Sequence, residues 1–181
     1  CGENPKRVYG NRNMLPSTRM GNMAGYRKAW IKAKEYKKSW DEYLAKDSSI
    51  PLSEKPIRDL RMETLAGVLE GEIKVHNHCY RADEMVQMID MSKEFGYKIS
   101  AFHHTVEGYK IAPILAKEGI CGVMWADWWG FKQEAYDMVR ENIALTDYAG
   151  ACAIIHSDDA IQVQRLNQEI AKAMSAGNRM G

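Results

Sequence analysis

The second half of the chain repeats one pattern four times: a short apolar run of strand length, followed by a longer stretch with helical periodicity. The four pairs are 72–76 with 83–95, 98–103 with 107–117, 120–125 with 131–148, and 151–155 with 163–176. Strands that alternate with helices, with no hairpin signal between them, predict a parallel sheet with right-handed crossovers. We therefore expect an α/β fold in which the strands all point the same way.

The residues before this repeat predict two helices and two irregular segments. A helix start at 16–18 and helical spacing of the apolar residues indicate one long helix that ends near Lys46. A segment rich in serine and proline, 47–56, predicts a loop, and a shorter helix follows before Gly71. Residues 2–10 have the composition of a polar turn.

All of the histidines stand where one of these apolar runs stops. They are His76, His78, His103, His104 and His156, and the last is followed by Ser157, Asp158 and Asp159. Because the ends of parallel strands meet at one edge of a sheet, we expect these groups to converge on one point. A single histidine at a strand end is more often a hydrogen-bonded loop residue. Repetition at three strands indicates instead a site for zinc or a similar ion, which binds neutral imidazole and carboxylate.

Composition excludes several other classes of protein. With 45% hydrophobic residues, 27% charged residues and a net charge of +1, the chain has the composition of an ordinary soluble globular protein and not of a nucleic-acid binder. The lysine-rich stretch 28–38 also carries aromatic residues at helical spacing, which indicates a solvated helix face. No apolar run approaches the roughly 20 residues that span a bilayer, and no signal peptide is recognisable.

The cysteines have no paired spacing. They are Cys1, Cys79, Cys121 and Cys152, and three of them fall in or beside apolar runs, where free cysteine behaves as a small buried hydrophobe. We therefore expect a reduced, cytoplasmic setting. A first residue that is cysteine also suggests a hydrolase with an amino-terminal nucleophile, but the polar turn expected after it is unlike the buried strand that would hold such a group.

Four β/α units correspond to half of an eight-stranded barrel. A complete barrel takes about 250 residues, whereas this chain has 181. An open doubly wound sheet is the alternative, but ligand-type groups at the ends of successive strands favour a barrel mouth over a single crevice. We expect residues 1–181 to form a partial barrel domain, with 1–71 preceding the four units in 72–181. Its open edges require the missing half, another chain or a second copy, so we expect a homo-oligomer.

Five stretches of the chain resemble the amidohydrolase superfamily, in particular the metal-dependent amidohydrolases related to imidazolonepropionase. In order, they are GENPKRVYG (2–10), PSTRMG (16–21), VHNHCYRADEM (75–85), HHTVEGYKIAPILAKEGI (103–120) and HSDDAIQVQRLNQE (156–169). The resemblance implies a distorted (β/α)8 barrel. Its zinc, one or two ions or another divalent metal, is bound by an HxH pair on the first strand, often by a carboxylated lysine on the fourth, and by residues on the fifth, sixth and eighth.

Only the later ligands of that pattern have counterparts here. His76 falls on the fifth-strand position, with His78 as a neighbour or alternative ligand. His104, or less readily His103, matches the sixth-strand histidine, and Asp158 matches the eighth-strand aspartate. The HxH pair and the lysine have no counterpart, so this chain is expected to supply only the second half of the site.

The resemblance implies hydrolysis of an amide or cyclic amide bond of a small molecule by metal-activated water, with Asp158 transferring the proton. Tyr80 and Arg81 are candidate substrate-binding residues, although Arg81 has an alternative partner in Asp83 or Glu84. Glu107 and Tyr109 also match family residues, and either one orients a metal ligand or caps a helix. The aromatic cluster 125–131 would stand at the barrel mouth. The alternative function is that of a non-catalytic, amidohydrolase-like fragment that serves in assembly or binding.

Overall fold

The computed structural model describes residues 2–46 and 51–179. The helices are α1 (Glu3–Gly10), α2 (Arg19–Leu44), α3 (Leu60–Leu69), α4 (Ala82–Phe95), α5 (Gly108–Glu118), α6 (Asn142–Tyr148) and α7 (Leu166–Gly177), with short 3-10 turns at Leu52–Glu54, Gln133–Ala135 and Gln162–Arg165. The strands are β1 (Val75–Cys79), β2 (Ile99–His104), β3 (Cys121–Met124) and β4 (Ala153–Ile155). Within these ranges, no helix is both long and apolar enough to cross a membrane.

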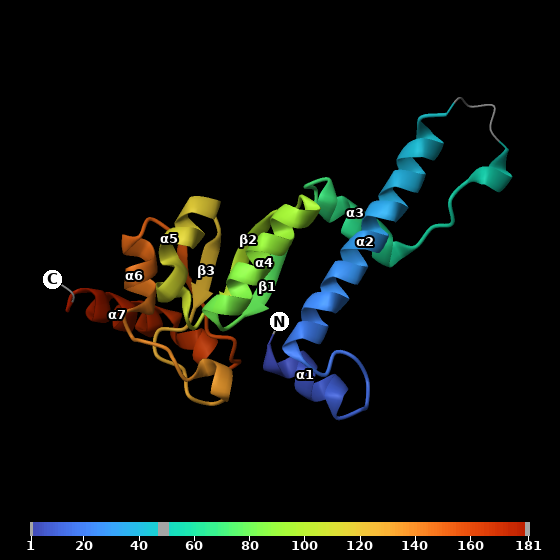
Figure 1. Cartoon of the computed structure of the whole chain (residues 1–181). Coiled ribbons are helices and arrows are strands. Elements are labelled where there is room, and N and C mark those ends of the chain that lie inside the picture. Colours follow the sequence, from blue (N-terminus) through green and yellow to red (C-terminus); the bar gives the residue numbers. More distant parts are fainter. Residues whose placement is uncertain (1, 47–50, 180–181) are drawn as a thin grey trace.

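The strands form one parallel sheet in the order β1-β2-β3-β4 (Figure 1), which confirms the predicted α/β alternation. Each strand lies beside the next one in the chain, and a helix separates the two in sequence, as right-handed crossovers require. The sheet is open: β1 and β4 are its two edges, and the barrel expected from the repeat is not closed within the described residues.

The two faces of the sheet are unequal. On one face, side chains such as Phe102 of β2, Met85 and Ile89 of α4 and Leu115 of α5 form the main apolar core. Strand residues alternate between faces, and the other face carries His76 and His78 of β1, both exposed, and Ile154 of β4, which is 42% exposed. A parallel sheet is normally buried on both faces, so this face lacks its usual cover.

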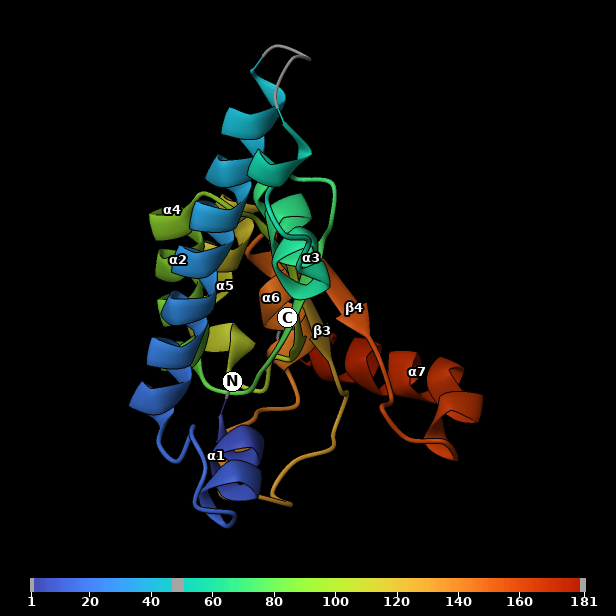
Figure 2. The same cartoon turned by 90° about the vertical axis from the view of Figure 1, so that its right-hand side faces the viewer.

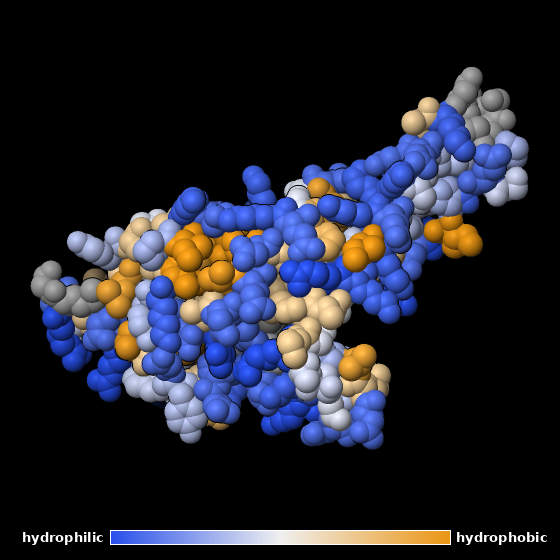
Figure 3. Space-filling view, in the orientation of Figure 1, coloured by the Kyte–Doolittle hydropathy of each residue, from blue (hydrophilic) through white to orange (hydrophobic). Residues whose placement is uncertain are grey.

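The long helix α2 is attached to the sheet domain by aromatic packing. Trp30 is buried and stacks on Tyr97, with ring centroids 4.2 Å apart, and lies 6.5 Å from the ring of Phe95. Beyond this contact α2 runs on past the sheet with α3 at its side (Figures 1 and 2). Figure 3 shows that hydrophilic residues cover most of α2 on this face, while apolar residues gather around α5.

Three of the predicted elements differ in the structure. Strand β1 covers Val75–Cys79 and not 72–76, because its pairing with β2 begins at Val75 and continues through Cys79. His76 and His78 therefore lie within the strand. The predicted α-helix over 131–148 exists only as α6, because Ala135 and Met138 of the preceding loop pack in one apolar cluster with Tyr80 and Trp125. The polar turn expected at 2–10 is helix α1. The predicted loop at 47–56 lies partly outside the described residues.

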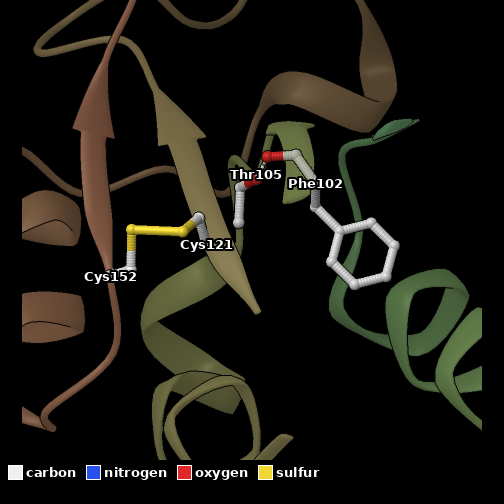
Figure 4. Close-up of a disulfide and its surroundings, with 4 residues drawn as sticks. All are labelled: Phe102, Thr105, Cys121 and Cys152. Atoms are coloured by element: carbon white, nitrogen blue, oxygen red, sulfur yellow. Dashed lines mark hydrogen bonds between the residues drawn. A yellow bond between two sulfur atoms is a disulfide. The ribbon is translucent and has the colours of Figure 1, made fainter. Parts of the chain in front are cut away.

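The expectation of free cysteines is wrong: Cys121 and Cys152 form a disulfide (Figure 4), and Cys79 is not free either. The parallel register aligns Gly122 of β3 with Ala153 of β4. That register places the two preceding cysteines side by side, with a Cα–Cα distance of 4.4 Å, although 31 positions separate them in sequence. Sequence spacing could not reveal this pair, because it depends on strand register. Cys1 lies outside the described residues, so the suggestion of an amino-terminal nucleophile is not tested.

We predict that Trp30→Ala lowers the free energy of unfolding by about 3–5 kcal/mol, because it removes a buried ring from the junction between α2 and the sheet domain. Trp40→Ala is the matched control: Trp40 lies on the same helix, half-buried, against Tyr36 and Tyr43. Urea denaturation followed by circular dichroism measures both. Equal losses in the two variants would contradict this account of how α2 is attached.

Candidate functional site

The five histidines lie close together toward the carboxyl ends of the strands, but the prediction that each one stands where a strand stops is wrong for His76 and His78, which lie within β1. His76 and His78 project from β1, His103 and His104 end β2, and His156 follows β4 directly. The His156 backbone N–H donates to the carbonyl of Met124, which extends the pairing of β3 and β4 by one residue. Centroid distances between neighbouring imidazoles range from 4.7 Å for His78 and His104 to 5.9 Å for His103 and His156.

Four of these side chains form two close pairs. Nδ1 of His78 lies 2.7 Å from Nε2 of His104, and Nδ1 of His76 lies 3.0 Å from Nε2 of His103. In each pair one nitrogen must carry the hydrogen, because two lone pairs would repel at this distance. The structure therefore brings His78, and not His76, against His104. His76 lies two residues further from the strand end.

An unusual backbone turn aims His104 at this point. His104 and Thr105 both have left-handed backbone angles, with φ of 74° and 44°, which is uncommon for residues other than glycine and unfavourable for a β-branched residue. The Thr105 hydroxyl donates to the Phe102 carbonyl at 2.8 Å (Figure 4), and the backbone N–H of Thr105 donates to the Cys79 carbonyl at 2.9 Å. Strained conformations of this kind persist where surrounding contacts hold them, often at functional sites.

Asn142, at the start of α6, holds the same turn from the other side. Its side chain is fully buried, its Nδ2 donates to the Thr105 carbonyl at 2.9 Å, and its Oδ1 accepts the Tyr109 N–H at 2.8 Å. Gly108 stands next to it, where an added Cβ would lie only 2.7 Å from Cγ2 of Thr105. The turn therefore restricts which side chains fit at Asn142 and at Gly108.

Two aromatic rings pack against His104. Its imidazole stacks on Tyr80 and on Trp125, with both centroid distances at 4.6 Å and interplanar angles of 20° and 24°, and the centroids of these two rings are 6.0 Å apart. Trp125 also stacks on His156, with centroids 5.0 Å apart. Its indole N–H donates to the Ser157 carbonyl at 2.7 Å, which fixes the segment that leads to Asp158. These aromatic contacts leave His104 only 3% exposed.

Asp158 faces the histidines from the segment after β4. Its Oδ2 lies 4.0 Å from Nδ1 of His104, its side chain is 54% exposed, and its φ of 55° is again left-handed. Asp159 has a different role, because its Oδ1 accepts the backbone N–H groups of Ile161 and Gln162. The two adjacent aspartates are therefore distinct: Asp158 faces the site, and Asp159 supports the following turn.

The site holds its buried histidines in the neutral form. Burial lowers the pKa of His104 to about 3, and the neighbouring His78, His156 and Lys132 side chains disfavour a further positive charge beside them. Burial also lowers the pKa of His156 to about 4, although the charge of Asp158 opposes the shift. Burial and the neighbouring His78 and His76 lower the pKa of His103 as well. Neutral imidazole is the form that binds a metal ion.

The chemistry of these donors fits a divalent ion. Nδ1 of His104 and Nε2 of His156 are buried and have no hydrogen-bond partner among the described residues, a costly state for a polar atom unless something else binds it. The set is incomplete, however. In the described ranges, no group of three or more histidine, cysteine, aspartate or glutamate side chains is arranged to hold a metal ion.

The predicted substrate-binding residues are not all gathered at the site. Tyr80 stacks on His104, as described above. Arg81 instead forms a two-pronged ion pair with Asp83, at 2.9 and 3.2 Å. Oε2 of Glu107 accepts the Ala82 N–H at 2.8 Å and so caps α4, and the Tyr109 hydroxyl donates to the Asp137 carbonyl at 3.3 Å.

Three residues that contribute to the site had no assigned role from sequence. Trp125 belongs to the aromatic cluster predicted at the mouth, but its stacking on two histidines was not foreseen. Asn142 and Lys132, whose ammonium lies 3.7 Å from the ring centroid of Tyr80, belong to a stretch that was predicted to be helix. Neither lies in a recognisable motif, so only the fold places them.

Comparison with known proteins agrees with this geometry. A search against protein-family models finds no match. The chain is 33% identical, over 185 aligned positions that include 98% of it, to a protein named "Amidohydrolase tasK" from Hapsidospora irregularis. It is also 33% identical to an amidohydrolase of known structure from Thermotoga maritima MSB8, which superposes on 97% of the chain with a TM-score of 0.86.

Both of these proteins are named amidohydrolases, and both are longer than the matched region. The chain spans 19% of the Hapsidospora protein and 45% of the Thermotoga structure. The likeness shows that the open parallel sheet of this chain has the fold of part of the Thermotoga amidohydrolase. Neither name specifies a metal or a substrate.

We predict that Asn142→Ala lowers the free energy of unfolding by about 1–3 kcal/mol, because the Thr105 carbonyl and the Tyr109 N–H lose their buried partner. Asn167→Ala is the control, since Asn167 is an exposed residue in the first turn of α7 and should change stability by less than about 0.5 kcal/mol. Chemical denaturation compares the two variants. A loss no larger than that of the control would show that Asn142 does not hold the turn.

Proposed function

We propose that this chain forms the second half of the barrel of a metal-dependent amidohydrolase, which hydrolyses an amide or cyclic amide bond of a small molecule. The observation that carries the proposal is the close pair of His78 and His104. It lies at the carboxyl end of a parallel sheet, beside Asp158, with the His104 imidazole kept neutral by burial and with a backbone turn that other contacts hold in place. Two amidohydrolases that are 33% identical support the same assignment.

The open sheet supports the half-barrel part of the proposal. Its uncovered face carries His76, His78 and Ile154, and both edge strands are free to pair within the described residues. A partner that closes this sheet would cover the face and supply further ligands. We propose the missing half of the barrel as that partner, or failing that another chain or a second copy in a homo-oligomer.

His78, His104 and Asp158 are the proposed ligands of one or two divalent ions, most simply zinc, with His76 as the alternative to His78. A divalent ion at such a site supplies activation of water and polarisation of an amide carbonyl. The protein's own contribution is to keep His104 neutral, through burial, and to hold it against the rings of Tyr80 and Trp125.

We propose Asp158 as the group that moves the proton. Its carboxylate is half exposed and lies 4.0 Å from Nδ1 of His104, so it is accessible both to water and to a substrate above the strand ends. It would accept a proton from the attacking water and transfer it to the departing nitrogen, because an amide anion is too poor a leaving group.

The turn after β1 is the proposed substrate-binding segment. Tyr80 already faces the site. Arg81 would bind a substrate carboxylate only after leaving Asp83, in the two-pronged geometry that guanidinium favours. Glu107 holds the start of α4 and thereby this turn, while Tyr109 would act from the edge of the site. A relationship to imidazolonepropionase is part of this proposal and rests on the sequence motifs alone.

The decisive variants are His104→Ala and Asp158→Asn, made in the protein that contains this chain together with the rest of its barrel. Each should reduce amide hydrolysis by about 10²–10⁴-fold, because each removes a group that acts on the reacting atoms. Asp90→Asn, on the exposed surface of α4, is the control. The assay uses a panel of N-acyl amino acids, dipeptides and cyclic amides, with circular dichroism to show that the variants fold.

Full activity in both site variants would rule out this assignment. The alternative, a non-catalytic protein that serves in assembly or binding, makes a different prediction: no member of the panel is hydrolysed, and His104→Ala leaves the affinity for the partner unchanged. The same experiment therefore separates the two functions.

A further inference from the structure

Lys132, in the loop between β3 and α6, contacts the ring that covers His104. Its ammonium lies 3.7 Å from the ring centroid of Tyr80 and 5.6 Å from that of Phe131, and its side chain is only 17% exposed. Tyr80 in turn stacks on His104, with ring centroids 4.6 Å apart. A cation held over an aromatic ring and away from water attracts that ring strongly. Lys132 therefore helps to hold the ring of Tyr80 in place, and the ring of Tyr80 helps to hold the imidazole of His104.

A buried carboxylate fixes Lys132 in this place. The side chain of Glu134 is fully buried, and its Oε1 lies 2.9 Å from the Lys132 ammonium, an ion pair without hydrogen-bond geometry. The guanidinium of Arg19, at the start of α2, lies 3.6 Å from the other oxygen. A buried carboxylate is costly unless cations and donors surround it. Glu134 therefore has little freedom to move, and Lys132 is held with it.

The same carboxylate binds the beginning of the described chain. Oε2 of Glu134 accepts the Glu3 N–H at 2.8 Å. Gly2 approaches so closely that a Cβ on it would lie 2.3 Å from Oε2, and its φ of +96° is itself suited only to glycine. Asn22 of α2 donates to the Gly2 carbonyl at 3.3 Å, which holds this segment in place. Residues 2 and 3 are thus connected to the site through Glu134.

We propose that Lys132 is a positioning residue for the candidate site: it holds Tyr80 against His104, and Glu134 joins this arrangement to the segment at Gly2 and Glu3. Lys132 touches no ligand atom in this account, so its effect on catalysis is indirect. The proposal depends on the proposed function only in treating His104 as a site residue. The arrangement of Lys132, Tyr80 and His104 is measurable without a metal or a substrate.

Lys110 provides a matched control. It also lies over a tyrosine ring, 5.7 Å from the centroid of Tyr109, and it pairs with two carboxylates, Glu107 and Asp137. In the described part of the chain, however, the ring of Tyr109 stacks on no histidine. Lys110→Met therefore removes the same kinds of contact as Lys132→Met, but not the connection to His104.

The test is the NMR spectrum of the imidazole protons in the protein that contains this chain together with the rest of its barrel, with the His104 signals assigned from a His104→Gln variant. In Lys132→Met these signals should move downfield, because the shielding face of Tyr80 is no longer held over His104. Lys132→Arg should keep them near their original position, since a guanidinium also binds over an aromatic ring. Gly2→Ala, which displaces Glu134, should shift them in the same direction as Lys132→Met. Lys110→Met should leave them in place.

Unchanged His104 signals in a folded Lys132→Met protein would overturn the proposal. If that variant does not fold, Glu134→Gln and Gly2→Ala decide the question, and unchanged signals in both would overturn it equally. A uniform fall in thermal stability with no change at His104 would count as the same negative result, because it would show a merely structural ion pair.

Hydrolysis assays separate this proposal from the proposed function. In an active protein, Lys132→Met should lower kcat by about 10-fold or more, as misplacement of a site group does, and Lys132→Arg should restore most of the loss. If no form hydrolyses amides while the His104 signals respond as expected, the proposed function fails and the positioning role stands. If the protein is active but the signals do not respond, only the positioning role fails.

Discussion

The parallel register of β1 and β2 is the constraint on which the site depends. It aligns His78 with His103 and Cys79 with His104, so imidazoles from two strands reach the same edge of the sheet. The left-handed turn at His104 and Thr105 then places Nε2 of His104 2.7 Å from Nδ1 of His78. A shift of one residue in this register would reverse the faces of the side chains and separate the pair.

The surroundings of this pair favour ligand binding over simple packing. Burial holds the pKa of His104 far below its usual value, the rings of Tyr80 and Trp125 both stack on it, and Asn142 satisfies the polar groups of the turn behind it. Within the part of the chain that the structure describes, a buried ring nitrogen of His104 and one of His156 nevertheless have no hydrogen-bond partner. A protein that had only to pack this edge would not need five histidines there, whereas one that completes a metal site with further residues would.

Sequence reasoning succeeded where the signal was local. Helical periodicity, strand-length apolar runs and helix-ending glycines such as Gly96 identified the β/α units, and parallel topology alone then placed the histidines together. It failed where the outcome depends on contacts between distant segments. The choice of His78 over His76 beside His104, the disulfide of Cys121 with Cys152 and the irregular loop that carries Lys132 all follow from register and packing, which no local pattern encodes.

The metal content of the protein that carries this chain together with the rest of its barrel tests the central claim most directly. Elemental mass spectrometry of the purified protein, and of its His104→Ala and Asp158→Asn variants, measures it. The account predicts one or two divalent ions per copy, about the number that such sites bind, with a clear loss in both variants. A folded wild-type protein that binds no divalent ion, or variants that keep the full content, would contradict it.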